Sequence, residues 1–505
     1  MKKILATILL LFCTCILMSA QGTFNVVYNY SIELGLTDAG GCAAQSVMET
    51  DNGYLVFATA VVPGNLGKVF GVRFDSNGGL LGELEHYGAT PYDYNYGYID
   101  PVEKDASGSI VVLTEFEAGN YNYSRQLLAR FDVLGDTINT HLLLDTGYVG
   151  IRQTALLAGG RFAACGFSDP DSVPATALLL VGDTSGSIQV LRNYTNALDA
   201  LGIQGLSSGG LLLCGYQPTG VDNSIWVMRL DSAGNTIWRR DIGGSRFAFK
   251  NVSAVQTQDG GIVATCSFMP LPGSPTDDQW NYFRKWDIDG NVQWTKQYNE
   301  QNSTTAYDME ELASGELVAC GAEGATPIAN HGILMRLEPD GDLIWLRRYA
   351  YYMNTSAIHI PYDVEPTADG GFVMTGQARQ GSTDSLPGLQ MVWLLKVDSM
   401  GCLVPGCGNI GVEEIALGLE NALQVYPNPT NAHVTVEAAL PSDLEVRGDL
   451  TLVLVDALGR TVRNETLGRV FTTTILDLSA LPKGVYHLHL RDDERWLSGT
   501  SVVVE

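Results

Sequence analysis

The sequence predicts an all-β protein, with a seven-bladed β-propeller followed by a small β-sandwich. An Asp-x-x-Gly turn, once with Glu in place of Asp, recurs seven times between residues 45 and 405. The spacings of 57, 51, 48, 56, 51 and 60 residues are typical of repeat architectures. Residues of strand type surround each turn, and the repeat region contains no convincing amphipathic helix. The turns begin at Asp75, Asp132, Asp183, Asp231, Asp287, Glu338 and Asp398.

The fifth repeat shows the predicted unit most clearly. Its four strand-like runs are VSAVQT (252–257), GIVATCSF (261–268), NYFRKWD (281–287) and VQWTKQY (292–298). Each run is rich in β-branched and aromatic residues and is bounded at one end by an Asp-Gly turn. Four antiparallel strands repeated seven times predict the blades of a propeller.

The two ends of the repeat array predict how the ring closes. The seventh unit has its third strand, MVWLLKVD (391–398), but CLVPGC follows Gly401 where a fourth strand is expected. At the other end, TFNVVYNY (23–30) precedes the first unit and resembles an unpaired fourth strand. We expect this N-terminal strand to pair into the last blade, because an open ring would expose sheet edges.

The N-terminus predicts export. Lys2 and Lys3 precede an apolar run from Ile4 to Met18, and Ser19 and Ala20 follow it. This run is too short to span a bilayer, so residues 1–20 are a predicted signal peptide for Sec export to the periplasm. We expect no transmembrane segment elsewhere. The formal net charge of −26 argues against nucleic acid or an anionic membrane as a partner.

The cysteines predict one local disulfide. Cys402 and Cys407 bracket the short segment LVPG and are candidates for a bond in an oxidising compartment. Cys165, Cys214 and Cys320 each precede a glycine at like positions of their repeats. Packing in a tight strand explains this pattern better than metal binding does.

The predicted topology sorts the loops onto two faces. The Asp-Gly turns form one face, here called the turn face. The other connections form the opposite, connection face, and include the longer segments 89–100, 117–126 and 269–281. Aromatic side chains there are candidates for stacking on sugars or contacting a protein, although several could instead pack beneath their own loops. These candidate ligand-binding residues are Tyr92, Tyr94, Tyr96, Tyr98, Tyr121, Tyr123 and Trp280.

Two repeated features are interpreted as scaffold. A basic residue stands two positions before six of the seven anchors, which predicts rows of ion pairs beside the turns. A tryptophan stands four residues after the turn glycine in three units. The bases are Arg73, Arg130, Arg229, Lys285, Arg336 and Lys396, and the tryptophans are Trp238, Trp294 and Trp345.

No metal site, cofactor or catalytic motif is predicted. A hairpin turn explains Asp287-x-Asp289-Gly better than a calcium loop, because calcium needs six to eight oxygen ligands. His487 and His489 share one face of a strand, where a solvated position is favoured over a metal site. HExxH and phosphate-binding glycine loops are missing from the sequence. Paired carboxylates for glycosidase chemistry remain open.

The C-terminal segment carries a family resemblance. Residues 408–420 form a predicted linker, and the module at 421–505 contains YPNPT (426–430), DALGR (456–460) and LPKGVYHLHL (481–490). Together these motifs resemble the type A C-terminal sorting domain of type IX secretion substrates, and the repeats resemble propeller-like arrays that precede such domains. The resemblance implies an immunoglobulin-like β-sandwich read by the type IX secretion machinery, with cleavage common in the family. The matching signature residues are Pro427, Asn428, Pro429, Asp456, Gly459, Arg460, Gly484 and Tyr486.

These observations predict a secreted or outer-surface protein, with the propeller at 21–407. The leading hypothesis is non-enzymatic binding of a glycan or protein through the connection face. One alternative is a polysaccharide hydrolase or lyase that uses carboxylates at the channel mouth. Another is a structural component of the cell surface.

Overall fold

The computed structural model describes most of the chain from residue 22 to residue 505. The predicted signal peptide at 1–20 and most of the predicted linker at 408–420 lie outside the described residues. The segments not described are 1–21, 30–40, 63–65, 88–91, 96–101, 106–107, 118–119, 146, 170–174, 219–222, 246–251, 269–279, 299–302, 326–327, 353–355, 382–388, 408–414, 417–418, 420–421, 442–443, 458, 471 and 494.

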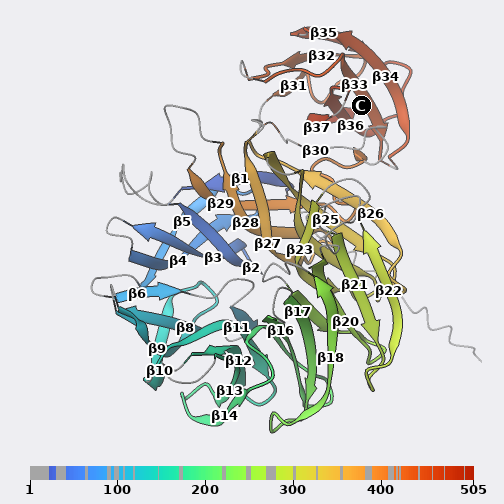
Figure 1. The fold of residues 1–505 in the computed structure, drawn as a ribbon. Coiled ribbons are helices and arrows are strands. Elements are labelled where there is room, and N and C mark those ends of the chain that lie inside the picture. Colours follow the sequence, from blue (N-terminus) through green and yellow to red (C-terminus); the bar gives the residue numbers. More distant parts are fainter. Residues whose placement is uncertain are drawn as a thin grey trace, which may run out of the picture.

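The described residues before 408 form strands and turns that group into antiparallel sheets (Figure 1). Sheet 1 contains β2 (Cys42–Thr50), β3 (Gly53–Val62), β4 (Leu66–Asp75) and β5 (Leu80–Tyr87). Sheet 2 contains β6 (Tyr92–Asn95), β7 (Glu103–Asp105), β8 (Gly108–Glu117), β9 (Asn120–Phe131) and β10 (Thr137–Asp145). Sheet 3 contains β11 (Val149–Leu157), β12 (Arg161–Ser168), β13 (Thr176–Asp183) and β14 (Ile188–Tyr194).

The same strand order continues along the chain. Sheet 4 contains β15 (Asp199–Gly205), β16 (Leu211–Pro218), β17 (Asn223–Leu230) and β18 (Thr236–Ser245). Sheet 5 contains β19 (Val252–Gln256), β20 (Ile262–Phe268), β21 (Trp280–Trp286) and β22 (Val292–Tyr298). Sheet 6 contains β23 (Ser303–Glu311), β24 (Leu317–Ala325), β25 (Ile328–Leu337) and β26 (Leu343–Tyr349). Sheet 7 contains β27 (Ile358–Pro366), β28 (Phe372–Arg379), β29 (Gln390–Val397) and β1 (Phe24–Tyr28).

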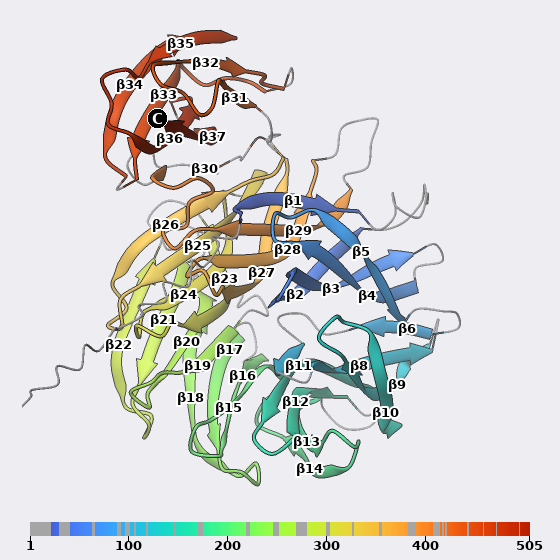
Figure 2. The same cartoon turned by 180° about the vertical axis from the view of Figure 1, so that it is seen from behind.

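Sheet 7 joins the two ends of the repeat array. β1 pairs antiparallel with β29, with a register that runs from Phe24 opposite Lys396 to Tyr28 opposite Val392. Figures 1 and 2 show the blue N-terminal strand beside the orange strands of this sheet. The side chain of Asn25 strengthens the join: its amide donates to the Ala350 carbonyl, and its oxygen accepts from the Trp393 indole. The predicted all-β fold and the pairing of the N-terminal strand into the last sheet are confirmed.

The sheets follow one another around a ring. The first strand of a sheet contacts that of its neighbour between sheets 3 and 4, 4 and 5, 5 and 6, 6 and 7, and 7 and 1, while sheet 2 contacts sheets 1 and 3. A separate buried apolar cluster fills each interface between adjacent sheets. Strands buried on both faces therefore explain the runs that are apolar without alternation. We interpret sheets 1 to 7 as the blades of the predicted propeller.

In four sheets a glycine of the second strand lies beside a register shift in the first strand. In sheets 3, 4, 6 and 7 the register between the first two strands shifts by one residue. An added Cβ at Gly166 would lie 1.9 Å from the Gly150 carbonyl oxygen, so a side chain cannot fit there. Sheet 1 has the same shift, with Ala58 at the position of the glycine. Sheet 5 has Ser267 at this position, and its first two strands pair without a shift. The glycines that follow the repeated cysteines, or Thr375, thus permit close backbone approach at a bulge; they are Gly166, Gly215, Gly321 and Gly376.

The C-terminal sandwich lies beside the ring (Figure 1). One sheet contains β31 (Leu423–Tyr426), β32 (His433–Ala438) and β35 (Thr473–Asp477). The other contains β33 (Leu450–Asp456), β34 (Thr461–Gly468), β36 (Gly484–Arg491) and β37 (Arg495–Val504). An apolar cluster that includes Val436, Leu452 and Leu488 fills the space between the two sheets. The predicted β-sandwich is therefore confirmed.

A short strand links the sandwich to the ring. β30 (Ile415–Ala416) pairs in parallel with β26 on one side and β37 on the other. In the part of the chain that the structure describes, no helix is long and apolar enough to cross a bilayer.

Candidate functional site

The predicted aromatic residues lie at the connection ends of two sheets. Tyr92 and Tyr94 belong to β6, and Tyr121 and Tyr123 belong to β9, so the expectation that these four lie in loops is wrong. Both segments pair with β8, in keeping with the β-propensity of tyrosine. Tyr96 and Tyr98 lie outside the described residues, as do the side chains of the other four tyrosines.

Trp280 is the described member of this aromatic group whose side chain can be placed. It begins β21, directly after the connection 269–279, and pairs in register with Phe268. Its side chain is half-buried. Trp280 therefore presents part of its ring at the connection face.

A second polar feature lies where the first strands converge near the ring axis. Backbone amides of one sheet donate to side chains of the next: Ile203 N–H to Gln153 at 2.7 Å, and Gln256 N–H to Gln204 at 2.7 Å. These glutamines line a small cavity of about 50 Å³ together with Ser253. Such a volume holds a water molecule or two, not a sugar ring.

Two buried carboxyl groups take part in the same linkage. Asp308 accepts from Val364 N–H at 3.2 Å, and Asp363 accepts from Val47 N–H at 2.6 Å. The two carboxyls also hydrogen-bond to each other, and burial raises the pKa of Asp308 to about 6. Their backbone hydrogen bonds hold sheets 6, 7 and 1 together, which is a structural task rather than the arrangement of a glycosidase pair.

The repeated bases have a different partner from the predicted one. Lys285 contacts Asp259, Arg336 contacts Glu316, and Lys396 contacts Asp369, in each case across the sheet. In each case the acid belongs to the hairpin between the first two strands of the sheet. In sheets 5 and 7 the anchor, two residues after the base, is not the partner of the base because the anchor side chain accepts hydrogen bonds within its own turn. Thus Asp287 accepts backbone N–H groups from Asp289 and Asn291 within its own turn. For these three bases the ion pairs expected beside the turns form with hairpin acids and not with the anchors. The hairpin interpretation of Asp287 agrees with the bonds within its turn.

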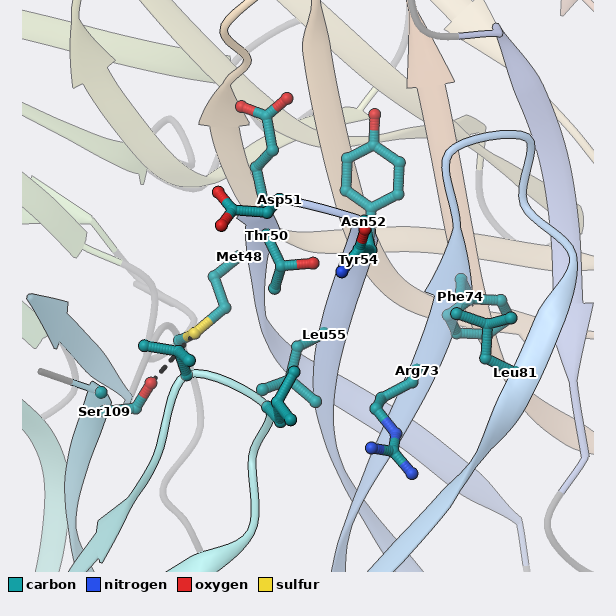
Figure 3. A pocket seen from close by; sticks show the side chains of 14 residues that line it. Met48, Thr50, Asp51, Asn52, Tyr54, Leu55, Arg73, Phe74, Leu81 and Ser109 are labelled. Atoms are coloured by element: carbon teal, nitrogen blue, oxygen red, sulfur yellow. Dashed lines mark hydrogen bonds between the residues drawn. The ribbon is translucent and has the colours of Figure 1, made fainter. Parts of the chain in front are cut away.

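A cavity lies on the turn face of the ring, between sheets 1 and 2. This turn-face pocket has a volume of about 580 Å³. Its walls come from the β2–β3 hairpin, from β4 and β5, and from the neighbouring turn of sheet 2, as Figure 3 shows. The sequence did not predict this site, because loop length directed attention to the opposite face. The pocket lining includes the side chains of Met48, Leu55, Arg73, Leu81, Val133 and Leu134.

The signature residues of the C-terminal sandwich form its turns and its final seam. Asn428 donates to the Ser501 carbonyl at 2.7 Å and accepts from Val503 N–H at 2.8 Å, which fastens the YPNPT segment to β37. Pro427, Asn428 and Pro429 are exposed, so this segment is available for recognition.

The other two motifs close turns in the same sandwich. Gly459 donates its N–H to the Asp456 carbonyl, and Arg460 forms an ion pair with the Asp456 side chain. Buried Tyr486 donates its hydroxyl to the Pro482 carbonyl at 2.8 Å, while Gly484 begins β36.

Comparison with known families decides what this sandwich is. Residues 424–505 match the family model described as "Secretion system C-terminal sorting domain". This segment is a type IX sorting domain. The sorting domain indicates secretion out of the cell and handling by the type IX machinery.

The rest of the chain is less closely related to known proteins. No curated protein matches the chain. The WD40 domain of SCAP from fission yeast is 8% identical, with 74% of this chain and 98% of that chain covered and a TM-score of 0.34. Sucrose-6-phosphate hydrolase from Lactobacillus gasseri is 10% identical, with 92% and 86% covered and a TM-score of 0.33. Similarities at this level support no conclusion about activity.

The sorting domain packs against the end of the ring. Cys402 and Cys407 form a disulfide that closes the loop between them. His489 lies against this loop: its Nε2 is 3.0 Å from the Pro405 carbonyl, and its Nδ1 accepts from the Trp496 indole at 2.9 Å. Because Nδ1 is an acceptor, Nε2 carries the proton and donates to Pro405.

This contact changes the interpretation of the two histidines. The expectation of a solvated histidine face is wrong for His489, which is fully buried, whereas His487 is half-buried and bonds to Ser501. Burial lowers the pKa of His489 to about 4, so the ring is neutral near pH 7. The strand face that the two residues share meets the ring instead of water.

Proposed function

We propose that the chain is a non-enzymatic binding protein that crosses the inner membrane by its signal peptide and leaves the cell by the type IX route. The observation that carries this proposal is the sorting domain at residues 424–505, which assigns the propeller to the outside of the cell. On the ring, the connection face is the proposed binding surface for a glycan or a protein.

The buried carboxyls favour binding over hydrolysis. Asp308 and Asp363 are buried acids of the first strands of sheets 6 and 7, and both are engaged in backbone hydrogen bonds between sheets. A glycosidase needs two carboxyls about 5 to 10 Å apart with a sugar between them. Groups that hydrogen-bond to each other leave no room for one.

Binding is tested on a glycan and extracellular-protein array with the chain lacking residues 1–20. We expect Trp280→Ala to weaken binding about tenfold, equivalent to ~1.4 kcal/mol. The matched control is Trp294→Ala, which removes a tryptophan from the turn face of the same sheet and should leave binding unchanged. Equal effects of the two substitutions would contradict the connection face as the site.

The alternatives give different results in the same samples. Release of products from a polysaccharide panel, abolished by one Asp or Glu substitution, would identify a hydrolase or lyase. Ordered self-assembly without ligand binding would identify a structural surface component.

Export is tested separately. Deletion of residues 424–505 should retain the protein in the periplasm, while the full chain reaches the surface or medium. Surface proteolysis and fractionation distinguish the two locations. Unchanged secretion of the deleted chain would overturn the export route without affecting the binding proposal.

A further inference from the structure

The turn-face pocket occupies a place that a tryptophan fills in other sheets. The base on the third strand lies opposite Trp238 in sheet 4, Trp294 in sheet 5 and Trp345 in sheet 6. In sheet 1 the base is Arg73, and its partner across the strands is Gly82. Nothing lies within 4 Å of where a Cβ on Gly82 would be. The missing side chain therefore leaves open space beside the guanidinium.

The tryptophans show what the missing side chain would have covered. The indole of Trp238 donates to the Ile288 carbonyl, and that of Trp294 donates to the Pro339 carbonyl. Ile288 and Pro339 both belong to the anchor turn of the following sheet. A tryptophan at this position thus closes the gap between its own sheet and the next turn. At sheet 1 the corresponding gap is the pocket, and the next turn contributes Val133 and Leu134.

The turn on the far wall is unusually apolar. Between its anchor and its glycine stand Val133 and Leu134, where the equivalent pairs are Ser-Asn, Thr-Ser, Ser-Ala, Ile-Asp, Pro-Asp and Ser-Met. Both side chains are about half exposed, at 54% and 49%. Leu81 on the near wall is 58% exposed. Apolar side chains that face one another across a cavity gain stability from an apolar occupant.

Arg73 supplies a charge without a local counterpart. Its Nε is buried and has no hydrogen-bond partner, and within the described residues Arg73 forms no ion pair. The equivalent bases in sheets 5, 6 and 7 each contact an acid. Arg229 of sheet 4 also has a buried Nε without a partner, but its Nη1 donates to the Ile288 carbonyl of the next turn. In sheet 1 the β2–β3 hairpin has two residues between strands, where sheet 5 has five, so no acid extends to the base. A buried unpaired donor of this kind costs about 1–3 kcal/mol until a ligand accepts from it.

Opposite charge lies at the other end of the pocket. Figure 3 shows Asp51 well separated from Arg73, with Leu55 between them, and no hydrogen bond joins Arg73 to another side chain drawn. Glu49 lies beside Asp51 and accepts from Ala368 N–H of sheet 7. The pocket therefore has a cationic end, an apolar middle and an anionic rim.

We propose that the turn-face pocket binds a short apolar peptide, with the peptide's C-terminal carboxylate at Arg73. The planar guanidinium matches a carboxylate in a bidentate pair, and the apolar walls accommodate the peptide side chains. The anionic rim at Asp51 suits the N-terminal ammonium and disfavours acidic side chains. The pocket of about 580 Å³ has room for a peptide of two or three residues. This site lies on the face opposite the proposed connection-face site, so either can fail alone.

Isothermal titration calorimetry with leucyl-phenylalanine tests the proposal on the chain without residues 1–20. The free dipeptide should bind, and its C-terminal amide should bind at least tenfold more weakly. Arg73→Met should weaken binding of the free dipeptide at least tenfold and should abolish the difference between acid and amide. No binding of the free dipeptide, or equal affinity for the amide, would overturn the proposal.

Two further variants guard against indirect effects. Arg229→Met removes the equivalent base in sheet 4, opposite Trp238, and should leave dipeptide affinity unchanged. Leu134→Glu places a carboxylate on an exposed part of the wall, where it should not affect folding and should weaken binding at least tenfold by repelling the ligand's carboxylate. Should Arg73→Met fail to fold, unchanged binding by Leu134→Glu would by itself refute the site.

Discussion

Sheets 1 and 7 are neighbours in the ring, and each has a basic residue two positions before the anchor of its third strand. The surroundings of these two bases differ. In sheet 7, Lys396 is fully buried, contacts Asp369 at 3.0 Å and donates to the Val397 carbonyl. In sheet 1, Arg73 lies beside Gly82 with an unpartnered Nε. One base is neutralised inside the scaffold, and the other faces a cavity.

The difference shows where to look for function in a repeat protein. A residue that recurs with the same partner in several blades maintains the blade. A residue that recurs while its partner is missing is available for another task. The absence of a tryptophan at Gly82 is therefore more informative about binding than the presence of tryptophan at three equivalent positions.

Loss of the acid in sheet 7 should have the largest effect. Asp369→Ala leaves the Lys396 ammonium buried and unpaired, and we expect a loss of about 4 kcal/mol in the free energy of unfolding. Chemical denaturation measures this loss. The double variant Asp369→Ala with Lys396→Met should recover part of it, because the charge is gone. A loss below about 1 kcal/mol would remove the contrast with sheet 1.

The closing strand provides the next test. Asn25→Ala leaves the Trp393 indole N–H and the Ala350 carbonyl without their partner inside the ring. We expect the free energy of unfolding to fall by about 2 kcal/mol, since buried polar groups lose their hydrogen bonds. Thermal and denaturant unfolding should both report the change. An effect near zero would mean that the join between β1 and β29 adds little to stability.

The pH dependence of the free energy of unfolding should also distinguish sheet 7 from sheet 1. Burial alone would raise the pKa of Asp369, but bonds from Thr367, Gly371 and Lys396 lower it below the usual value. Stability from this pair is therefore present above the unfolded pKa of about 3.9 and is lost as pH falls through the lower folded pKa. The decline should be smaller in the double variant at Asp369 and Lys396. Identical pH profiles would show that the pair does not contribute.

The smallest expected effect belongs to sheet 1. Arg73→Met should not lower the free energy of unfolding in the absence of ligand, because no protein partner of the guanidinium is lost and the unpartnered Nε is removed. Denaturant unfolding beside Asp369→Ala makes the comparison direct. A loss above about 2 kcal/mol would mean that Arg73 is scaffold after all.

Much of the fold could be predicted because its signals are local. The runs expected at 252–257, 261–268, 281–287 and 292–298 match β19, β20, β21 and β22 within one residue at each end. Asp-Gly turns fix where each strand ends, and β-branched and aromatic residues fix what lies between. The missing fourth strand of the last repeat was enough to predict the pairing of β1 with β29.

The partners of side chains could not be predicted in the same way. Spacing of two residues places Lys285 and Asp287 on one strand face, yet Lys285 contacts Asp259 from another hairpin. His489 similarly belongs to a strand with a polar face, and contact with Pro405, 84 residues away, buries it. The pocket arises from a side chain that sheet 1 lacks. Each of these depends on residues distant in sequence, which a pattern along one strand does not reveal.

The contact between the disulfide loop and the sorting domain has a consequence for maturation. Leu403, Val404 and Tyr352 pack with Val453, Val455 and Trp496 in one apolar cluster. Proteolysis between residues 407 and 424 would release the second group and leave the first in water. The sorting domain thus covers apolar side chains of the ring, and its removal would leave an exposed apolar patch that the intact chain lacks.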